Sequence, residues 1–365
     1  MRISVVHDPT LSEAFLRKMS QLGVDCIDFS DGTWLPGVAE QGYPDLDELL
    51  AIKGRLQSWG LEINRVSLPD MTETFMLEQE GADRELENAV RALKVLGEAG
   101  VPIARQRFHG DTFNHLMTPY TTFHRGGYRS HGDRLSVPGA AEEASRAQRV
   151  QVWDSTSNES PPQEALNSWW DRFCQVYSAL VPIAEEFAIK LAMHPSDVPL
   201  PDTPFGSLGY HRLIDAFPSR RVGYLYCCGT RAEAGGLPLV LDEIHNYGRK
   251  GRIFMIHLRN IRGSLATAGA YEEVALDDGD MNIFRILLEL RRVGFDGCIN
   301  PDHMAVITTD YETGNQWTPR LRKWLDASHT PDTQVAHQGL AFAVGYIKAL
   351  LTALDEFSGG RAGVG

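Results

Sequence analysis

The sequence predicts an α/β protein, a (β/α)8 TIM barrel with long insertions in its loops. Short apolar runs alternate with longer amphipathic runs about eight times along the 365 residues, as expected where each strand is followed by a helix. The first apolar run is followed by HDPTLSE, which has no glycine, whereas a doubly wound sheet usually carries a glycine-rich first turn. A barrel of roughly 250 residues also leaves room for insertions in a chain of this length.

Each predicted unit begins with a short apolar or β-branched run, which suits a strand buried on both faces. The predicted strands are ISVV (3–6), DCIDFS (25–30), EINRVSL (62–68), VPIARQRF (101–108), KLAMH (190–194), VGYLYCC (222–228), RIFMIHLRN (252–260) and GCINPDH (297–303).

The segments between these strands place apolar residues on one face at helical spacing. Several of them end on a glycine, as helices often do. The predicted helices span 11–23, 45–60, 83–100, 168–190, 208–217, 237–250 and 281–294.

We expect one barrel domain over residues 1–355, with two segments that exceed what a barrel needs. Residues 109–166 mix His, Gly, Thr, Arg and Ser with little periodicity, and residues 304–338 separate the last strand from the C-terminal helix. A loop of such length is usually a functional lid or a disordered insert. Residues 356–365 are expected to form a flexible tail.

The charge and cysteine content limit the partners and the compartment. The formal charge of -13 argues against binding to nucleic acid or to an anionic membrane surface. No run of about 18 apolar residues is present, so no membrane span is expected. Five scattered cysteines form no disulfide framework. With no signal peptide apparent, we expect a cytoplasmic protein, and a homo-oligomer because such barrels commonly assemble.

Candidate metal ligands stand at the ends of four successive predicted strands, where a barrel gathers its active-site residues. They are His194, Cys227, His257 and Asp302. Two imidazoles, a thiol and a carboxylate suit Mn²⁺, Fe²⁺, Co²⁺ or Zn²⁺, whereas Mg²⁺ and Ca²⁺ prefer oxygen ligands. Each residue alone also fits a structural role, for example a small core cysteine. Spacing alone leaves both interpretations open.

A second group of candidates is basic. Arg105, Arg107 and His109 alternate along one predicted strand and would share a face. Arg259 follows His257 by two residues and could join them. Together they predict a cationic pocket for a carboxylate or phosphate. The alternative is a solvated strand edge.

Four motifs occur in a fixed order: HPSDVP from His194, CCGT from Cys227, HLR from His257 and PDH from Pro301. This ordered set resembles the mannonate dehydratase family, metal-dependent barrels of hexuronate catabolism within the xylose-isomerase-like superfamily. The resemblance is clear from about residue 184 to 303 and weaker in the first 100 residues.

The resemblance implies a metal, typically Mn²⁺, held by His194, Cys227, His257 and Asp302. Cys227 is preferred over Cys228 because it stands in register with the family segment. The resemblance also implicates His303 in the chemistry beside Asp302. The implied reaction is loss of water from D-mannonate, a sugar acid, to give 2-keto-3-deoxygluconate.

The sequence departs from the family pattern at three places. Ser196 replaces a family Asp, Met304 replaces a Gly, and Leu340 stands where the family has a Tyr thought to transfer protons. These departures leave two alternatives open. One is a metal-dependent sugar isomerase or epimerase, and the other is a metal-containing barrel that binds a sugar without catalysis.

Overall fold

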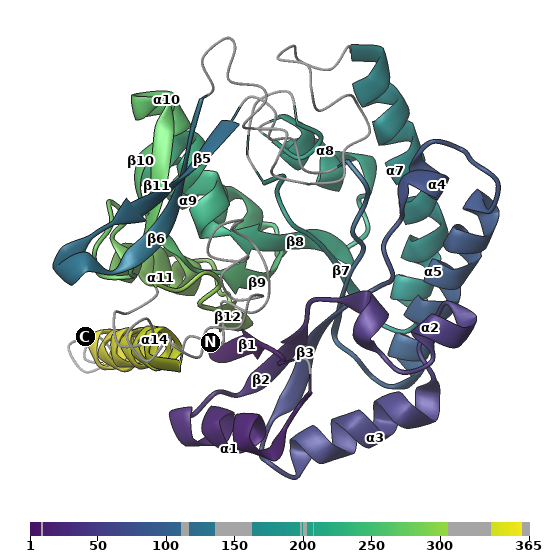
Figure 1. Ribbon diagram of the computed structural model, residues 1–365, viewed down its shortest axis with the longest axis horizontal. Coiled ribbons are helices and arrows are strands. Elements are labelled where there is room, and N and C mark those ends of the chain that lie inside the picture. Colours follow the sequence, from purple (N-terminus) through teal and green to yellow (C-terminus); the bar gives the residue numbers. More distant parts are fainter. Residues whose placement is uncertain are drawn as a thin grey trace.

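A computed structural model describes residues 1–8, 10–110, 117–135, 163–197, 199, 203–206, 208–305 and 337–359. Eight parallel strands close into a barrel in the order β1-β12-β9-β8-β7-β4-β3-β2 (Figure 1). The strands are β1 (Arg2–Val6), β2 (Cys26–Phe29), β3 (Glu62–Ser67), β4 (Ile103–Arg105), β7 (Lys190–Met193), β8 (Val222–Cys227), β9 (Ile253–His257) and β12 (Cys298–Asn300). The predicted barrel is confirmed.

Helices surround the barrel (Figure 1). The longer ones are α1 (Glu13–Leu22), α3 (Leu46–Gln57), α5 (Ala82–Glu98), α7 (Gln163–Glu186), α8 (Leu208–Ala216), α9 (Cys228–Arg249), α11 (Ile283–Arg292) and α14 (His337–Gly359). Short helical turns are η1 (Gly32–Trp34), α2 (Val38–Gln41), α4 (Glu73–Met76), η2 (Arg125–Gly127) and α10 (Leu265–Ala268).

Local chemistry explains where these helices begin and end. The Ser12 side chain accepts a hydrogen bond from the Phe15 backbone N–H at the start of α1, and Gly23 ends that helix with a φ of 70°. In α11, residues three and four apart are buried and form one apolar stripe: Ile283, Ile286, Leu287 and Leu290. Helix α9 begins at Cys228, nine residues before the predicted start, because it continues through a kink at Gly236.

A second sheet lies outside the barrel and was not predicted. Its antiparallel strands run in the order β10-β11-β6-β5, and Figure 1 shows them beside α9. They are β5 (Met117–Phe123), β6 (Arg129–Leu135), β10 (Asn260–Ser264) and β11 (Ala270–Val274). The described part of the 109–166 segment therefore contains paired strands instead of a disordered insert, and a role as a lid stays a prediction. Strand β5, MTPYTTF, lacks an apolar alternation, so its sequence does not reveal it.

The remaining expectations about the long segments concern residues that the structure does not describe. Of the 304–338 segment, residues 306–336 lie outside the described residues. Helix α14 extends to Gly359, into the tail expected to be flexible, and residues 360–365 are not described. In the part of the chain that is described, no helix has the length and hydropathy needed to span a membrane.

Two apolar clusters lie on either side of the barrel wall. The larger cluster fills the space between strands and helices. A smaller one contains residues from four neighbouring strands and occupies the barrel interior: Ile103, Ala192, Leu225, Phe254 and Met255. This packing holds the strand ends rigidly, so side chains at the carboxyl edge are placed by the barrel itself.

Candidate metal centre

Three predicted ligands converge at the carboxyl ends of neighbouring strands. His194 follows β7, Cys227 ends β8 and His257 ends β9. Each offers one ligand atom, and these atoms lie within 4.8 Å of one another. All three side chains are buried. Two imidazoles and one thiol at this separation can share a single ion.

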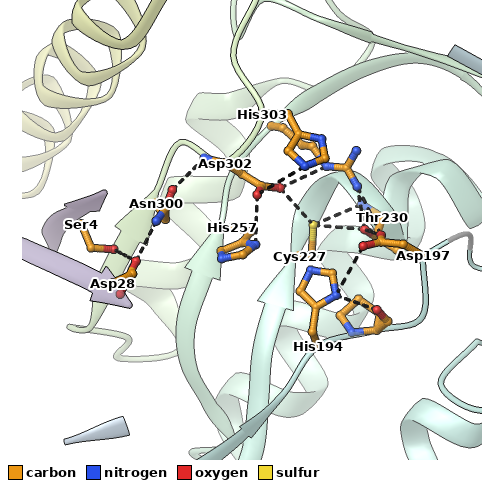
Figure 2. Close-up of polar contacts among 12 residues, drawn as sticks. Ser4, Asp28, His194, Asp197, Cys227, Thr230, His257, Asn300, Asp302 and His303 are labelled. Atoms are coloured by element: carbon orange, nitrogen blue, oxygen red, sulfur yellow. Dashed lines mark hydrogen bonds and ion pairs between the residues drawn. The ribbon is translucent and has the colours of Figure 1, made fainter. Parts of the chain in front are cut away.

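Asp302 lies beside two members of this triad, as Figure 2 shows. Its Oδ1 is 3.2 Å from His257 Nδ1, and its Oδ2 is 3.7 Å from Cys227 Sγ. The Asp302 backbone is left-handed, with a φ of 58°, a conformation that Asp tolerates better than most residues. Its N–H donates to Asn300 Oδ1 at 2.9 Å, which fixes this turn. Asp302 is thus placed to act as a fourth ligand, and that role stays a prediction.

The protonation of the histidines suits metal binding. Burial lowers the pKa of His194 to about 4 and that of His257 well below its usual value. Both imidazoles are therefore neutral near pH 7, the form that ligates a metal. The buried His257 Nε2 has no hydrogen-bond partner among the described residues. A buried polar atom in that condition is expected to meet a ligand.

The thiol of Cys227 contacts the first turn of α9. Burial raises its pKa to about 12, so the side chain is a neutral thiol unless an ion displaces the proton. The Thr230 N–H donates to Cys227 Sγ at 3.4 Å, whereas the Thr230 hydroxyl donates to Asp197 Oδ1 at 2.5 Å. The N–H would stabilise a thiolate. Cys228, by contrast, is packed in the large apolar cluster, which agrees with the preference for Cys227.

Arg259 lies among acidic side chains. Its guanidinium is 2% exposed and lies 2.8 Å from Glu233 and 3.2 Å from Asp302. It also pairs with Glu273. This placement differs from the expected clamp for a substrate carboxylate, because the protein's own carboxylates already surround the cation. Arg259 instead neutralises and positions Asp302.

His303 is connected to the second sheet. Its Nδ1 lies 2.7 Å from Glu273 Oε1 on β11, and its Nε2 lies 3.9 Å from Asp302 Oδ1. Burial lowers the pKa of His303, but the charges of Glu273 and Asp302 outweigh burial and raise it to about 9. Sequence reasoning missed Glu273, because nothing in the segment AYEEV separates a site residue from a surface one.

The structure separates the three basic candidates on the fourth predicted strand. Strand β4 ends at Arg105, so the alternation that predicted a shared face does not continue. Arg105 ends β4, which pairs with β7, so it lies at the same end of the barrel as His194. Arg107 forms a bidentate pair with Asp70 at 2.7 and 2.8 Å. The backbone N–H of His109 donates to the Met71 carbonyl at 2.7 Å.

The position expected for a family tyrosine is occupied by core packing. Leu340 lies near the start of α14 and is buried in the large apolar cluster. Gly339 abuts the Ala305 carbonyl, and a Cβ there would lie 2.3 Å from that oxygen. Leu340 therefore offers no group for proton transfer.

Comparison with known proteins identifies the family of this chain. A family model described as D-mannonate dehydratase (UxuA) matches residues 136–323. "Mannonate dehydratase 2" of Halalkalibacterium halodurans is 25% identical over 285 residues, which cover 74% of this chain and 81% of the relative. The mannonate dehydratase of Streptococcus pneumoniae is 24% identical over 293 residues, covering 72% of this chain and 75% of the relative.

Solved structures show the same fold. The mannonate dehydratase from Streptococcus suis serotype 2 superposes with a TM-score of 0.72 at 20% identity, covering 98% of this chain and 96% of that one. A D-psicose 3-epimerase, solved in the presence of D-fructose, gives a TM-score of 0.55 at 12% identity and covers 96% and 99%. The family match spans just over half of the chain and includes all four candidate metal ligands. The chain belongs to the D-mannonate dehydratase family.

Proposed function

We propose that this protein is a metal-dependent hydro-lyase that removes water from a sugar acid, with D-mannonate as the first candidate substrate. The observation that carries the proposal is the convergence of His194, Cys227 and His257, with Asp302 beside them, at the barrel's carboxyl end. The family membership of the chain supports the reaction, since a site alone fixes chemistry only by its groups.

A divalent ion, Mn²⁺ by resemblance or else Fe²⁺, Co²⁺ or Zn²⁺, would be held by His194, Cys227, His257 and Asp302. When bound, such an ion is a Lewis acid that stabilises negative charge on substrate oxygens as the C2 proton leaves. The charge of Arg259, 3.2 Å from Asp302, favours the ionised form of that carboxylate, which a metal ligand requires.

His303 would move a proton in this reaction. Loss of the C2 proton and of the C3 hydroxyl, as water, gives an enol that becomes the 2-keto-3-deoxy acid. Glu273 holds His303 Nδ1, and in the metal-free protein the charges of Glu273 and Asp302 raise the pKa of His303 to about 9 in spite of burial. We therefore assign His303 as the acid that protonates the departing hydroxyl.

An epimerase or isomerase is the second candidate. The observation that favours it is Leu340, which removes the phenol expected from the family pattern. An epimerase would need proton transfer at carbon but no departing hydroxyl. Assembly as a homo-oligomer and a cytoplasmic location stay predictions.

The test measures product and metal together. Protein loaded with Mn²⁺ is incubated with D-mannonate, other aldonates and ketoses, and 2-keto-3-deoxy acids are detected by mass spectrometry. We expect product from an aldonate, with His257→Ala and Asp302→Ala losing bound metal and turnover together. His245→Ala is the matched control, because His245 is exposed and pairs with Glu289 on the outside of the barrel.

Two results would contradict this proposal. Epimerised ketose without any 2-keto-3-deoxy acid would favour the epimerase. Full turnover by His257→Ala in the presence of a chelator would mean that the reaction does not use this metal site.

A further inference from the structure

Arg65 lies inside the barrel because β3 carries a bulge. Between β2 and β3 the register steps from Ile27 opposite Ile63 to Asp28 opposite Arg65, so Asn64 is the extra residue. A bulge of this kind re-aims side chains and is common beside active sites. Asn64 reaches the interior, since its Nδ2 donates to Asp28 Oδ1 at 2.7 Å. Arg65 is paired in the ladder with Ile103 of the interior cluster, so it faces the same way.

Among the described residues, Arg65 differs from the other fully buried arginines in having no acidic partner. Arg231 pairs with Glu243 at 2.6 Å, and Arg259 pairs with Glu233 at 2.8 Å. The Arg65 guanidinium is also about 1% exposed, yet its hydrogen bond is to a neutral group, Ser67 Oγ, at 3.1 Å. Its Nε is buried without a hydrogen-bond partner among the described residues.

The carboxylate that lies nearest in the ladder, Asp28, is occupied by other donors. Its Oδ1 accepts from Asn64, and its Oδ2 accepts from Ser4 and Asn300, each at 2.7 Å. Figure 2 shows the Ser4, Asp28 and Asn300 part of this network. Three neutral donors thus satisfy Asp28, and Arg65 remains a buried cation without a salt bridge in the described structure. Such a cation is costly to bury unless an anion joins it.

The guanidinium lies on the metal side of the interior. Its partner Ser67 is the last residue of β3, so the side chain extends toward the carboxyl end. In the closed order of eight strands, β3 stands four places from β9, across the barrel from His257. Arg105, opposite Ser67 in the ladder, brings a second positive charge to the same wall.

We propose that Arg65, with Arg105 beside it, binds the carboxylate of the sugar acid across the barrel from the metal ligands. The inference rests on the proposed function and deepens it, because it names the residue that selects an acid over a neutral sugar. A planar guanidinium matches a carboxylate in two parallel hydrogen bonds. A desolvated cation also rejects a neutral analogue, which would leave its charge unpaired.

The test compares two ligands that differ in charge. The probes are 3-deoxy-D-mannonate, which lacks the C3 hydroxyl that the reaction removes, and its neutral carboxamide. Each is titrated calorimetrically into metal-loaded protein. Wild-type protein should prefer the acid. Arg65→Met should weaken binding of the acid by about 10- to 100-fold, the range for a charge-assisted hydrogen bond. It should not weaken binding of the amide, because the unpaired cation that disfavours a neutral ligand is gone, and it should leave metal content unchanged.

The variants and outcomes separate this inference from the proposed function. Arg65→Lys keeps the positive charge but loses the planar guanidinium that can form two parallel hydrogen bonds to a carboxylate. The variant should therefore fold, and it should prefer the acid less than wild-type protein does. Unchanged acid preference in both Arg65 variants, or its loss in Arg107→Met instead, would overturn the inference. If wild-type protein dehydrates no aldonate but binds the acid through Arg65, the reaction is wrong and the subsite stands. If wild-type protein dehydrates D-mannonate but Arg65→Met still prefers the acid over the amide, the proposed reaction stands and the Arg65 subsite is wrong.

Discussion

Replacing Glu273 with Gln should change the protonation of His303 while preserving its surroundings. The Glu273 carboxylate lies 2.7 Å from His303 Nδ1, and the pKa of His303 rises from 6.5 to about 9 in spite of burial. That rise corresponds to about 3 kcal/mol in favour of the protonated imidazole. Glu273 is the strongest contributor that raises it, followed by Asp302. Glu273→Gln should therefore lower the pKa of His303 by at least about one unit, or ~1.4 kcal/mol.

Protonation of His303 should make the free energy of unfolding depend on pH. Because the folded-state pKa of His303 is raised, its contribution to stability is fully present below pH 6.5 and is lost as the pH rises through about 9. In metal-free protein, the free energy of unfolding should decrease over that window. The decrease should be smaller in Glu273→Gln, and the basic limb of the activity profile of loaded enzyme should move to lower pH.

The assay is an NMR titration of the His303 ring proton in metal-free protein. Glu272→Gln is the matched control, because it removes the same charge one residue earlier on β11, where Glu272 instead accepts from the Tyr120 hydroxyl at 3.2 Å. The control should shift the His303 pKa by far less than Glu273→Gln does. An unchanged His303 pKa in Glu273→Gln, or an equal shift in both variants, would refute the assignment of Glu273 as its partner.

Three further predictions concern stability. Glu243→Gln breaks the buried pair with Arg231 and should lower the free energy of unfolding in urea by about 3–5 kcal/mol; a loss under about 1 kcal/mol would contradict a buried pair. Burial lowers the pKa of His7 to about 4, so stability should fall by up to about 3 kcal/mol from pH 6.5 to 4; a fall equally steep in His7→Gln would exclude His7 as its source. Chelation should lower the Tm of metal-loaded wild-type protein; an equal drop in His257→Ala would mean that the metal acts elsewhere.

The strands could be predicted because each is a short apolar run bounded by polar segments. Since a barrel gathers strand ends, His194, Cys227 and His257 could be expected to meet although 63 positions of sequence separate the first from the last. The family resemblance added that the motifs carrying these residues occur in the family's order along the chain. Their burial and the neutral state of the imidazoles follow from the fold and agree with that expectation.

The second sheet escaped prediction for a physical reason. Strand β6, RSHGDRL, pairs with β5 and β11 through its backbone, and its side chains carry no apolar alternation. Strand propensity and apolar alternation reflect the burial of side chains. A strand stabilised mainly by backbone hydrogen bonds to its neighbours is therefore hard to recognise from its own sequence. Glu273 was missed together with its strand.

The basic residues show the same limit at the level of single side chains. The spacing of Arg105, Arg107 and His109 suggested one face, but β4 ends at Arg105 and Asp70 pairs with Arg107. Conversely, no motif marks Arg65. Its inward direction depends on one extra residue in the pairing of β2 with β3, which a sequence does not display.

The sequence by itself determined the barrel, the net charge and the residues able to ligate a metal, because these depend on periodicity and on the chemistry of each side chain. Only the tertiary structure decided which of those residues share a site and which charges remain to be met by a ligand. Arg259 proved to be surrounded by the protein's own carboxylates, whereas Arg65 is buried without an ion pair in the part of the chain that the structure describes. That distinction depends on distances between strands far apart in the chain, and side-chain identity alone does not contain them.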